Sequence, residues 1–189
     1  MNFSTSLLGY PWIALGVVWL AAAGMKKPTL RSLTVGRRIF YFFFALLGFF
    51  LLARPYSHSG WLGQRFIAEI PAIYYGGFGI TVAGALFAIW ARLVLGRNWS
   101  GRPSVMAGHE LITRGPYAVA RHPIYTGLLL AAAGTALAIG QWRSIAGFAL
   151  LFAAFLVKMS AEEQLMMQTF PEAYPRYRQR VKALIPGVF

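Results

Sequence analysis

Two adjacent glutamates lie just after the last long apolar stretch of the chain. Glu162 and Glu163 follow Lys158, and a spacing of four places Lys158 and Glu162 on one helix face, whereas Glu163 points about 100° away. Ionisable groups at such depth in a membrane are costly, which favours a functional role. The two glutamates would supply the negative charge that a cationic ligand needs. The alternative is an ion pair between Lys158 and Glu162 that satisfies itself at the membrane interface.

A second segment combines a turn, two cationic donors and the start of a helix. Gly115-Pro116 indicates a turn, and Pro123 suits the first position of a helix. The free N–H groups and the positive dipole end of that helix, with Arg121 and His122 beside them, would suit an anionic group such as a carboxylate. The alternative is an ordinary arginine flanking a membrane span.

Residue types that are missing exclude several kinds of active site. The sequence has no Asp and no Cys, so neither a Ser-His-Asp nor a Cys-His triad can be assembled. His58, His109 and His122 have no metal-binding spacing, so no metal site is expected. Gly77-Phe78-Gly79 lies inside an apolar run and is not a dinucleotide-binding motif.

The composition indicates what must position these groups. Of the 189 residues, 58% are hydrophobic and 12% are charged, with a mean hydropathy of +0.56 and a formal net charge of +13. Such a chain is too apolar to be disordered, and a soluble module that binds nucleic acid would not carry this much apolar surface. We therefore expect an all-α, polytopic helical bundle in the lipid bilayer, with no nucleic-acid partner.

Five stretches approach the length that crosses about 30 Å of hydrocarbon as a helix. They run from about Leu7 to Met25, between Arg38 and Arg54, from Ala72 to Ala91, from Pro123 to Gly140, and from Trp142 to Val157 with a helical continuation toward Phe170. The third contains small residues that allow close helix approach: Gly76, Gly77, Gly79, Ala83 and Gly84. A cleaved signal peptide is the alternative for the first stretch, and the absence of a preceding basic residue disfavours it.

The basic residues predict the orientation. Fifteen of the eighteen lie in segments 26–38, 92–121 and 158–182, on one side of a five-span bundle. Only Arg54, Arg65 and Arg143 lie on the other side. By the positive-inside rule the crowded side is cytoplasmic, which places the N-terminus outside and the C-terminus and active site inside.

The tail after the fifth span has apolar and aromatic residues at helical spacing: Phe170, Tyr174, Tyr177, Val181 and Ile185. This pattern predicts an amphipathic cytoplasmic helix on the membrane surface or over the site. We expect one membrane domain, residues 1–189, with three spans in residues 1–95, and two spans and the C-terminal helix in residues 96–189.

At these residues the sequence resembles the isoprenylcysteine carboxyl methyltransferase family and its relatives, the phospholipid N-methyltransferases. The resemblance covers about residues 90–187. The matching pieces are Arg97-Asn98-Trp99-Ser100, His109-Glu110-Leu111-Ile112, Gly115-Pro116-Tyr117, Arg121-His122-Pro123-Ile124-Tyr125-Thr126-Gly127, Glu162-Glu163, and the tail residues Phe170, Tyr174, Tyr177, Val181 and Pro186.

The resemblance implies a methyltransferase without a Rossmann domain that uses S-adenosyl-L-methionine and forms S-adenosyl-L-homocysteine as its product. In the family the cofactor lies on the cytoplasmic side, between the last two spans and the C-terminal helix, so residues 96–189 would be the cofactor-binding half. By position, His109, Glu110, Leu111 and Ile112 would line the adenosine end, and Tyr117 would cover the cofactor. His122, Pro123, Ile124 and Tyr125 would hold its amino-acid end, and Glu162 would bind a polar or cationic part.

Three residues are catalytic candidates, Arg121, Lys158 and Glu163, and the resemblance bears on the first two. Lys158 falls where the eukaryotic enzymes carry an arginine that engages the substrate, so a point charge replaces bidentate recognition. Arg121 is the other candidate for steering an anionic nucleophile. Glu163 would be the acid free to take a proton from an amine substrate.

We expect methyl transfer to the carboxylate of an isoprenylcysteine-like, prenylated or other lipid molecule, and no feature indicates an oligomeric state. The alternatives are a phospholipid or lipid-amine N-methyltransferase, a membrane sterol-type reductase, and a small transporter or assembly subunit. A transporter is disfavoured because the first, second and fourth spans carry almost no polar residues near their middles.

Overall fold

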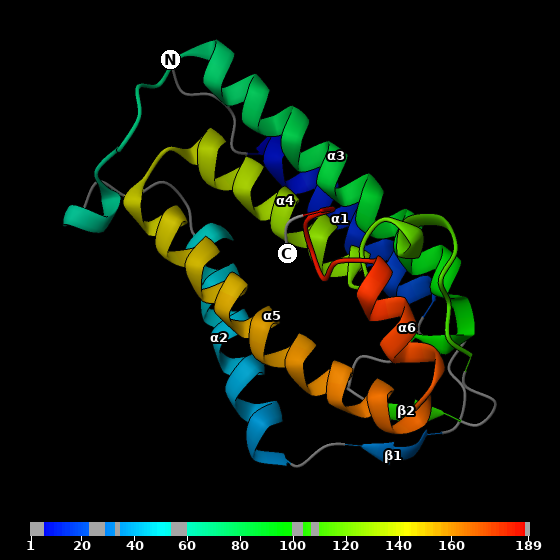
Figure 1. Cartoon of the computed structure of the whole chain (residues 1–189). Helices are drawn as coiled ribbons and strands as arrows, with labels where there is room; N and C mark the ends of the chain where they lie inside the picture. Colours follow the sequence, from blue (N-terminus) through cyan, green and yellow to red (C-terminus); the bar gives the residue numbers. More distant parts are fainter. Residues whose placement is uncertain are drawn as a thin grey trace.

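The computed structural model of this chain describes residues 6–22, 29–32, 35–53, 60–99, 104–106 and 110–187. Its long helices are α1 (Ser6–Ala21), α2 (Val35–Ala53), α3 (Pro71–Leu95), α4 (Pro123–Ile139) and α5 (Trp142–Thr169). Figure 1 shows them running along one another, with the short helix α6 (Ala173–Arg180) at one end. Each predicted span coincides with one of these helices, which confirms the helical architecture.

Two of the helical segments, Pro71–Asn98 and Trp142–Thr169, are long and apolar enough to cross a membrane. Three shorter apolar helices accompany them, Leu7–Ala21, Ile39–Ala53 and Pro123–Ile139. Large apolar side chains cover the outside of the bundle, including Leu20, which is 78% exposed, and Phe42, which is 61% exposed. Such a surface requires an apolar surrounding, as expected for an integral membrane protein.

Glycines allow close packing of α3 against α4, which lie side by side in Figure 1. A Cβ atom added to Gly84 would lie 2.6 Å from the carbonyl oxygen of Gly127, and one added to Gly127 would lie 2.6 Å from that of Gly84. Gly77 and Gly134 face each other in the same way, also at 2.6 Å. Only residues without a side chain allow the two backbones to come this close.

Two of the predicted glycines do not take part in this contact. A Cβ atom added to Gly76 or Gly79 would meet no atom within 4 Å. Gly77 and Gly84 are seven residues apart and therefore share one helix face, whereas positions 76 and 79 point elsewhere. The expectation was right for the helix and wrong for these two glycines.

A second close pair is formed by α2 and α5, which also lie together in Figure 1. A Cβ atom added to Gly48 would lie 2.8 Å from the carbonyl oxygen of Gly147. The bundle therefore consists of two glycine-sealed helix pairs, with α1 packed against α3.

Two short strands link the pairs at one end of the bundle. β1 (Thr29–Ser32) pairs antiparallel with β2 (Ser104–Met106). The sequence did not predict them, because three or four residues without apolar alternation carry no strand signal. The two strands tie the segment before α2 to the segment after α3.

At the opposite end, the loop that contains η2 (Trp61–Gly63) is fastened to the turn between α4 and α5. Gln141 Nε2 donates to the carbonyl oxygen of Gly63 at 2.8 Å, and the amide of Phe66 donates to Gly140 at 2.9 Å. Arg143, 4% exposed, donates from Nε to Gln141 Oε1 at 2.6 Å. This arginine is therefore a structural element of the turn rather than a free loop charge.

Arg92 also differs from the sequence expectation of a loop residue. It lies in α3, because the apolar pattern continues through Leu95, and it is 1% exposed. Its Nη2 donates to the carbonyl oxygen of Ala22 and its Nη1 to that of Gly96, both at 3.0 Å. It thereby satisfies carbonyl groups at the C-terminal ends of α1 and α3, where a cation is favourable.

Candidate active site

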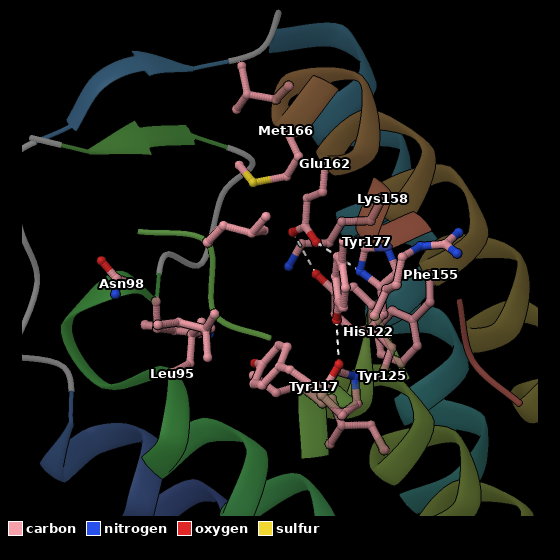
Figure 2. A pocket seen from close by; sticks show the side chains of 18 of the residues that line it. Leu95, Asn98, Tyr117, His122, Tyr125, Phe155, Lys158, Glu162, Met166 and Tyr177 are labelled. Carbon is pink, nitrogen blue, oxygen red and sulfur yellow. Dashed lines mark hydrogen bonds and ion pairs between the residues drawn. The ribbon is translucent and has the colours of Figure 1, made fainter. Parts of the chain in front are cut away.

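A cavity of about 280 Å³ lies at the end of the bundle where α3 and α5 end and α4 begins. In Figure 2, Leu95 at the end of α3 and Asn98 just after it stand on one side of the cavity, opposite Glu162 and Met166 of α5. Residues 110–112 also line it, as do tyrosines of α6. The cavity is therefore built from segments far apart in the sequence.

Glu162 forms the acidic part of the cavity wall. The hydroxyl of Tyr125 donates to Glu162 Oε1 at 2.7 Å, and His122 Nδ1 lies 3.6 Å from Glu162 Oε2 (Figure 2). His122 and Tyr125 are three residues apart at the start of α4, so their rings share one face and stack with centroids 5.7 Å apart. The carboxylate is thus held in position from α4.

Lys158 supplies a positive charge to the same cavity. Its Nζ lies 5.3 Å from the ring centroid of Tyr125 and 5.6 Å from that of Tyr41, within cation–π range. Among the described residues no carboxylate oxygen lies within 4.0 Å of Nζ. The ion pair with Glu162 that the spacing allows is therefore not formed, and the ammonium is held between aromatic rings.

Arg121 and Glu163 contact each other behind His122. Arg121 donates to Glu163 Oε1 from Nε at 2.9 Å and from Nη2 at 2.6 Å, and His122 Nε2 lies 3.3 Å from the same oxygen. Arg178 Nε lies 3.5 Å from Glu163 Oε2. Glu163 does not line the cavity. Of the three catalytic candidates, only Lys158 therefore faces the cavity without a carboxylate partner in the described structure.

His122 joins the two glutamates. Burial lowers the pKa of His122, but hydrogen bonds and charge interactions with Glu162 and Glu163 outweigh burial and raise the pKa above its ordinary value of 6.5. The protonated imidazole donates from both ring nitrogens, so it can bridge the two carboxylates. A cation between two anions also keeps both glutamates in place.

Residues 181–184, which we call the tail segment, cover the start of α4. The amide of Arg121 donates to the carbonyl oxygen of Lys182 at 2.8 Å, and the amide of His122 donates to that of Ala183 at 3.0 Å. Thr126 Oγ1 donates to Leu184 at 2.9 Å. The sequence predicted a longer helix here, but α6 ends at Arg180, and the next residue, Val181, is extended.

The tail segment binds two of the amides that were expected to be free at the start of α4. The N–H groups of Arg121 and His122 are used by the tail segment, and Pro123 has no N–H. The amides of Ile124 and Tyr125 have no acceptor within the described part of the chain, and both residues line the cavity. They are the donors that this helix start can offer to an anion.

Tyr177 of α6 completes this side of the site. Its hydroxyl donates to the carbonyl oxygen of Tyr117 in η4 (Gly115–Ala118), as the dashed line in Figure 2 shows. Burial raises the pKa of Tyr177 to about 12, with Arg121 opposing the shift. The hydroxyl therefore remains a donor throughout the physiological range and holds Tyr117 in the cavity wall.

Another part of the wall is apolar and is formed by side chains of the long helices. Trp19 of α1, Phe49 of α2, Leu128 of α4 and Phe155 of α5 line it. Phe155 stacks on Tyr125 with ring centroids 4.9 Å apart. The cavity thus has a charged end at Glu162 and Lys158 and an apolar end among the helices.

Eleven of the residues singled out from the sequence line this cavity: Glu110, Leu111, Ile112, Tyr117, Arg121, His122, Pro123, Ile124, Tyr125, Lys158 and Glu162. His109 lies outside the described residues. Sequence reasoning missed Trp19, Phe49 and Phe155, which no motif marks. It interpreted Asn98 and Trp99 as an anchor at the membrane interface, whereas both line the cavity.

Comparisons with known proteins show what this chain is similar to. The model of the "Isoprenylcysteine carboxyl methyltransferase (ICMT) family" matches residues 77–168. The protein-S-isoprenylcysteine O-methyltransferase of Schizosaccharomyces pombe is 37% identical over 79 residues, which cover 41% of this chain and 34% of that protein. Protein-S-isoprenylcysteine O-methyltransferase B of Arabidopsis thaliana is 27% identical over 181 residues, 91% of this chain and 85% of that protein.

A further relative is named as a metal-resistance protein and not as a methyltransferase. The nickel-cobalt-cadmium resistance protein NccN of Alcaligenes xylosoxydans xylosoxydans is 31% identical over 140 residues, 72% of this chain and 59% of that protein.

Proposed function

We propose that this chain is a member of the isoprenylcysteine carboxyl methyltransferase family, to which it is similar, and that it methylates the carboxylate of an isoprenylcysteine-like lipid at the membrane, using S-adenosyl-L-methionine. The observation that carries this proposal is the cavity itself, which has charged groups at one end and an apolar wall among membrane helices at the other. A water-soluble cofactor and a lipid substrate require such a division.

The donor set of the charged end suits S-adenosyl-L-methionine, which when bound supplies the methyl group. Glu162 would hold a cationic part of the cofactor, and the amides of Ile124 and Tyr125 would hold its carboxylate at the positive end of α4. Leu111 and Ile112 would contact the adenosine. His122 and Tyr125 keep Glu162 oriented toward the cavity.

Lys158 would hold the acceptor carboxylate. A carboxylate nucleophile needs no general base, so the residues of this site need only align the reactants and exclude water. The rings of Tyr41 and Tyr125 fix the ammonium in place, and the apolar wall would receive the lipid tail. Arg121 acts as a positioning residue for His122 and the tail segment.

The arrangement of Glu163 favours a carboxylate acceptor over an amine. An amine must lose a proton before it can attack, and Glu163 was the acid predicted to take that proton. Its carboxylate is bound by Arg121 and Arg178 and lies outside the cavity. Incubation with a labelled methyl donor and host lipids distinguishes the two, because a base-labile ester supports the carboxylate and a methylated amine contradicts it.

We further propose that all five long helices cross the bilayer, with the N-terminus outside and the cavity on the cytoplasmic side. The ends of α3 and α5 and the start of α4, which enclose the cavity, adjoin the segments that hold most basic residues. The exposed arginines of α6, Arg176, Arg178 and Arg180, would face lipid headgroups there.

Calorimetry of S-adenosyl-L-methionine binding to the purified protein tests the proposed cofactor site. We expect Glu162→Ala and His122→Ala each to weaken binding by about 10- to 100-fold, because each removes a hydrogen bond that involves a charged group. Glu172→Ala, at an exposed acid near α6, is the matched control and should bind normally. Absence of binding to the wild-type protein, or unchanged binding in both variants, would disprove the site.

A further inference from the structure

An aromatic pair lies beneath the apolar end of the cavity. Phe49 of α2 lines the cavity, and Trp12 of α1 packs against its ring edge-to-face, with centroids 5.2 Å apart and an interplanar angle of 87°. Trp12 itself is not part of the lining. It therefore supports Phe49 from outside the cavity.

Trp12 is fixed by a hydrogen bond inside the bundle. Its indole Nε1 donates to Thr135 Oγ1 of α4 at 3.1 Å, and Thr135 is 4% exposed. Thr135 Oγ1 lies 3.2 Å from Thr81 Oγ1 of α3, which is fully buried. A bulky ring held by a buried polar partner has a defined position, unlike the many aromatic residues on the lipid-facing surface.

The pair lies at the depth where a lipid tail would end. Thr135 follows Tyr125 by ten residues, which corresponds to about 15 Å along α4, whereas the lining residue Leu128 follows Tyr125 by three. A tail whose carboxylate contacts Lys158 would extend past Phe155 and Leu128 and reach Phe49. Trp12 stands directly behind that ring.

We propose that Trp12 and Phe49 limit the length of the lipid tail that the enzyme accepts. The inference rests on the proposed function and assigns its chain-length specificity to these two rings. Loss of the indole would let the Phe49 ring move away and lengthen the cavity toward the membrane centre. A larger ring at position 49 would shorten it.

The test compares S-geranyl-, S-farnesyl- and S-geranylgeranyl-cysteine as methyl acceptors of the full chain in detergent. In Trp12→Ala we expect the ratio of kcat/KM for the geranylgeranyl over the farnesyl compound to rise about tenfold, since added methylenes in a hydrophobic pocket discriminate on this scale. Trp90→Ala, at a tryptophan of α3 that is 49% exposed, is the matched control and should leave the ratio unchanged. Inhibition constants of the corresponding unreactive carboxamides should shift in parallel.

Two further variants keep the inference falsifiable if Trp12→Ala does not fold. Thr135→Val removes the acceptor of the indole N–H and should raise the ratio by a smaller factor. Phe49→Trp should lower the ratio and make the geranyl compound the better acceptor relative to the two longer ones. An unchanged ratio in variants that still bind S-adenosyl-L-methionine overturns the inference and leaves the proposed function intact. A wild-type protein that methylates none of the three acceptors overturns the proposed function as well.

Discussion

His122 connects most of the charged groups of the site, so its protonation should be visible in stability. Because its pKa is raised above 6.5 in the folded protein, protonated His122 stabilises the fold fully below about pH 6.5, and this contribution is lost as the pH rises through the raised pKa. We expect the melting temperature of the wild-type protein to fall more on alkalinisation than that of His122→Gln. Thermal unfolding in detergent across this range measures the difference, and parallel curves would contradict it.

Arg121 should be important for stability and for holding the tail segment. Its side chain is 8% exposed and that of Glu163 is 16% exposed, so Arg121→Met leaves a largely buried carboxylate with weaker partners. We expect a loss of about 2–3 kcal/mol in unfolding free energy. Trypsin should also cleave faster at Lys182, because the tail segment loses a donor to Val181.

The exposed residue Arg176 provides the control for this experiment. Arg176→Met should leave both the unfolding free energy and the cleavage rate nearly unchanged. If both arginine variants behave alike, Arg121 does not hold the tail segment.

At the scale of residues, the sequence indicated charged groups better than apolar ones. Glu162, His122 and Lys158 stand out because ionisable residues are rare in a chain that is 58% hydrophobic. Trp19, Phe49 and Trp12 could not be singled out, because 16% of the residues are aromatic and most of these can serve as lipid-facing surface. Which charges pair with each other also could not be predicted, since Arg121 and Glu163 lie 42 residues apart and meet only through packing.

At the scale of elements, the glycine contacts between α3 and α4 make a matched prediction. Gly84→Val would place side-chain atoms against the backbone of α4, whereas Gly79→Val adds the same atoms where nothing lies within 4 Å. We expect Gly84→Val to destabilise the protein by about 3 kcal/mol and Gly79→Val to change stability by no more than about 0.5 kcal/mol. Denaturation by SDS in mixed micelles compares the two, and equal losses would show that this face is not the contact.

The sequence predicted the helices well because long apolar runs bounded by Pro71, Pro123 and Gly140 carry a strong signal. It did not predict β1 and β2, nor the end of the last helix. The spacing of Val181 and Ile185 continues a helical pattern, but the carbonyl oxygens of residues 182 and 183 accept hydrogen bonds from the amides of Arg121 and His122 instead. A tertiary contact overrode the local pattern there.

At the scale of the whole molecule, the proposed orientation can be tested by labelling single introduced thiols. No native cysteine has to be replaced first, because the chain has none. Ala68→Cys and Glu172→Cys place single thiols at exposed positions near opposite ends of the bundle. In sealed right-side-out vesicles, a membrane-impermeant maleimide should label position 68 at once and position 172 only after permeabilisation. The reverse pattern would contradict the orientation.

The tail segment has a consequence for biosynthesis. Its contacts to Arg121, His122 and Thr126 come from residues that follow all five long helices in the chain. Since a polypeptide emerges from the ribosome N-terminus first, every hydrophobic segment can enter the translocon before the stretch that fastens the start of α4 has been made. A nascent chain should therefore be fully inserted yet unable to retain the methyl donor, and competence to bind it should appear only once translation has passed Leu184.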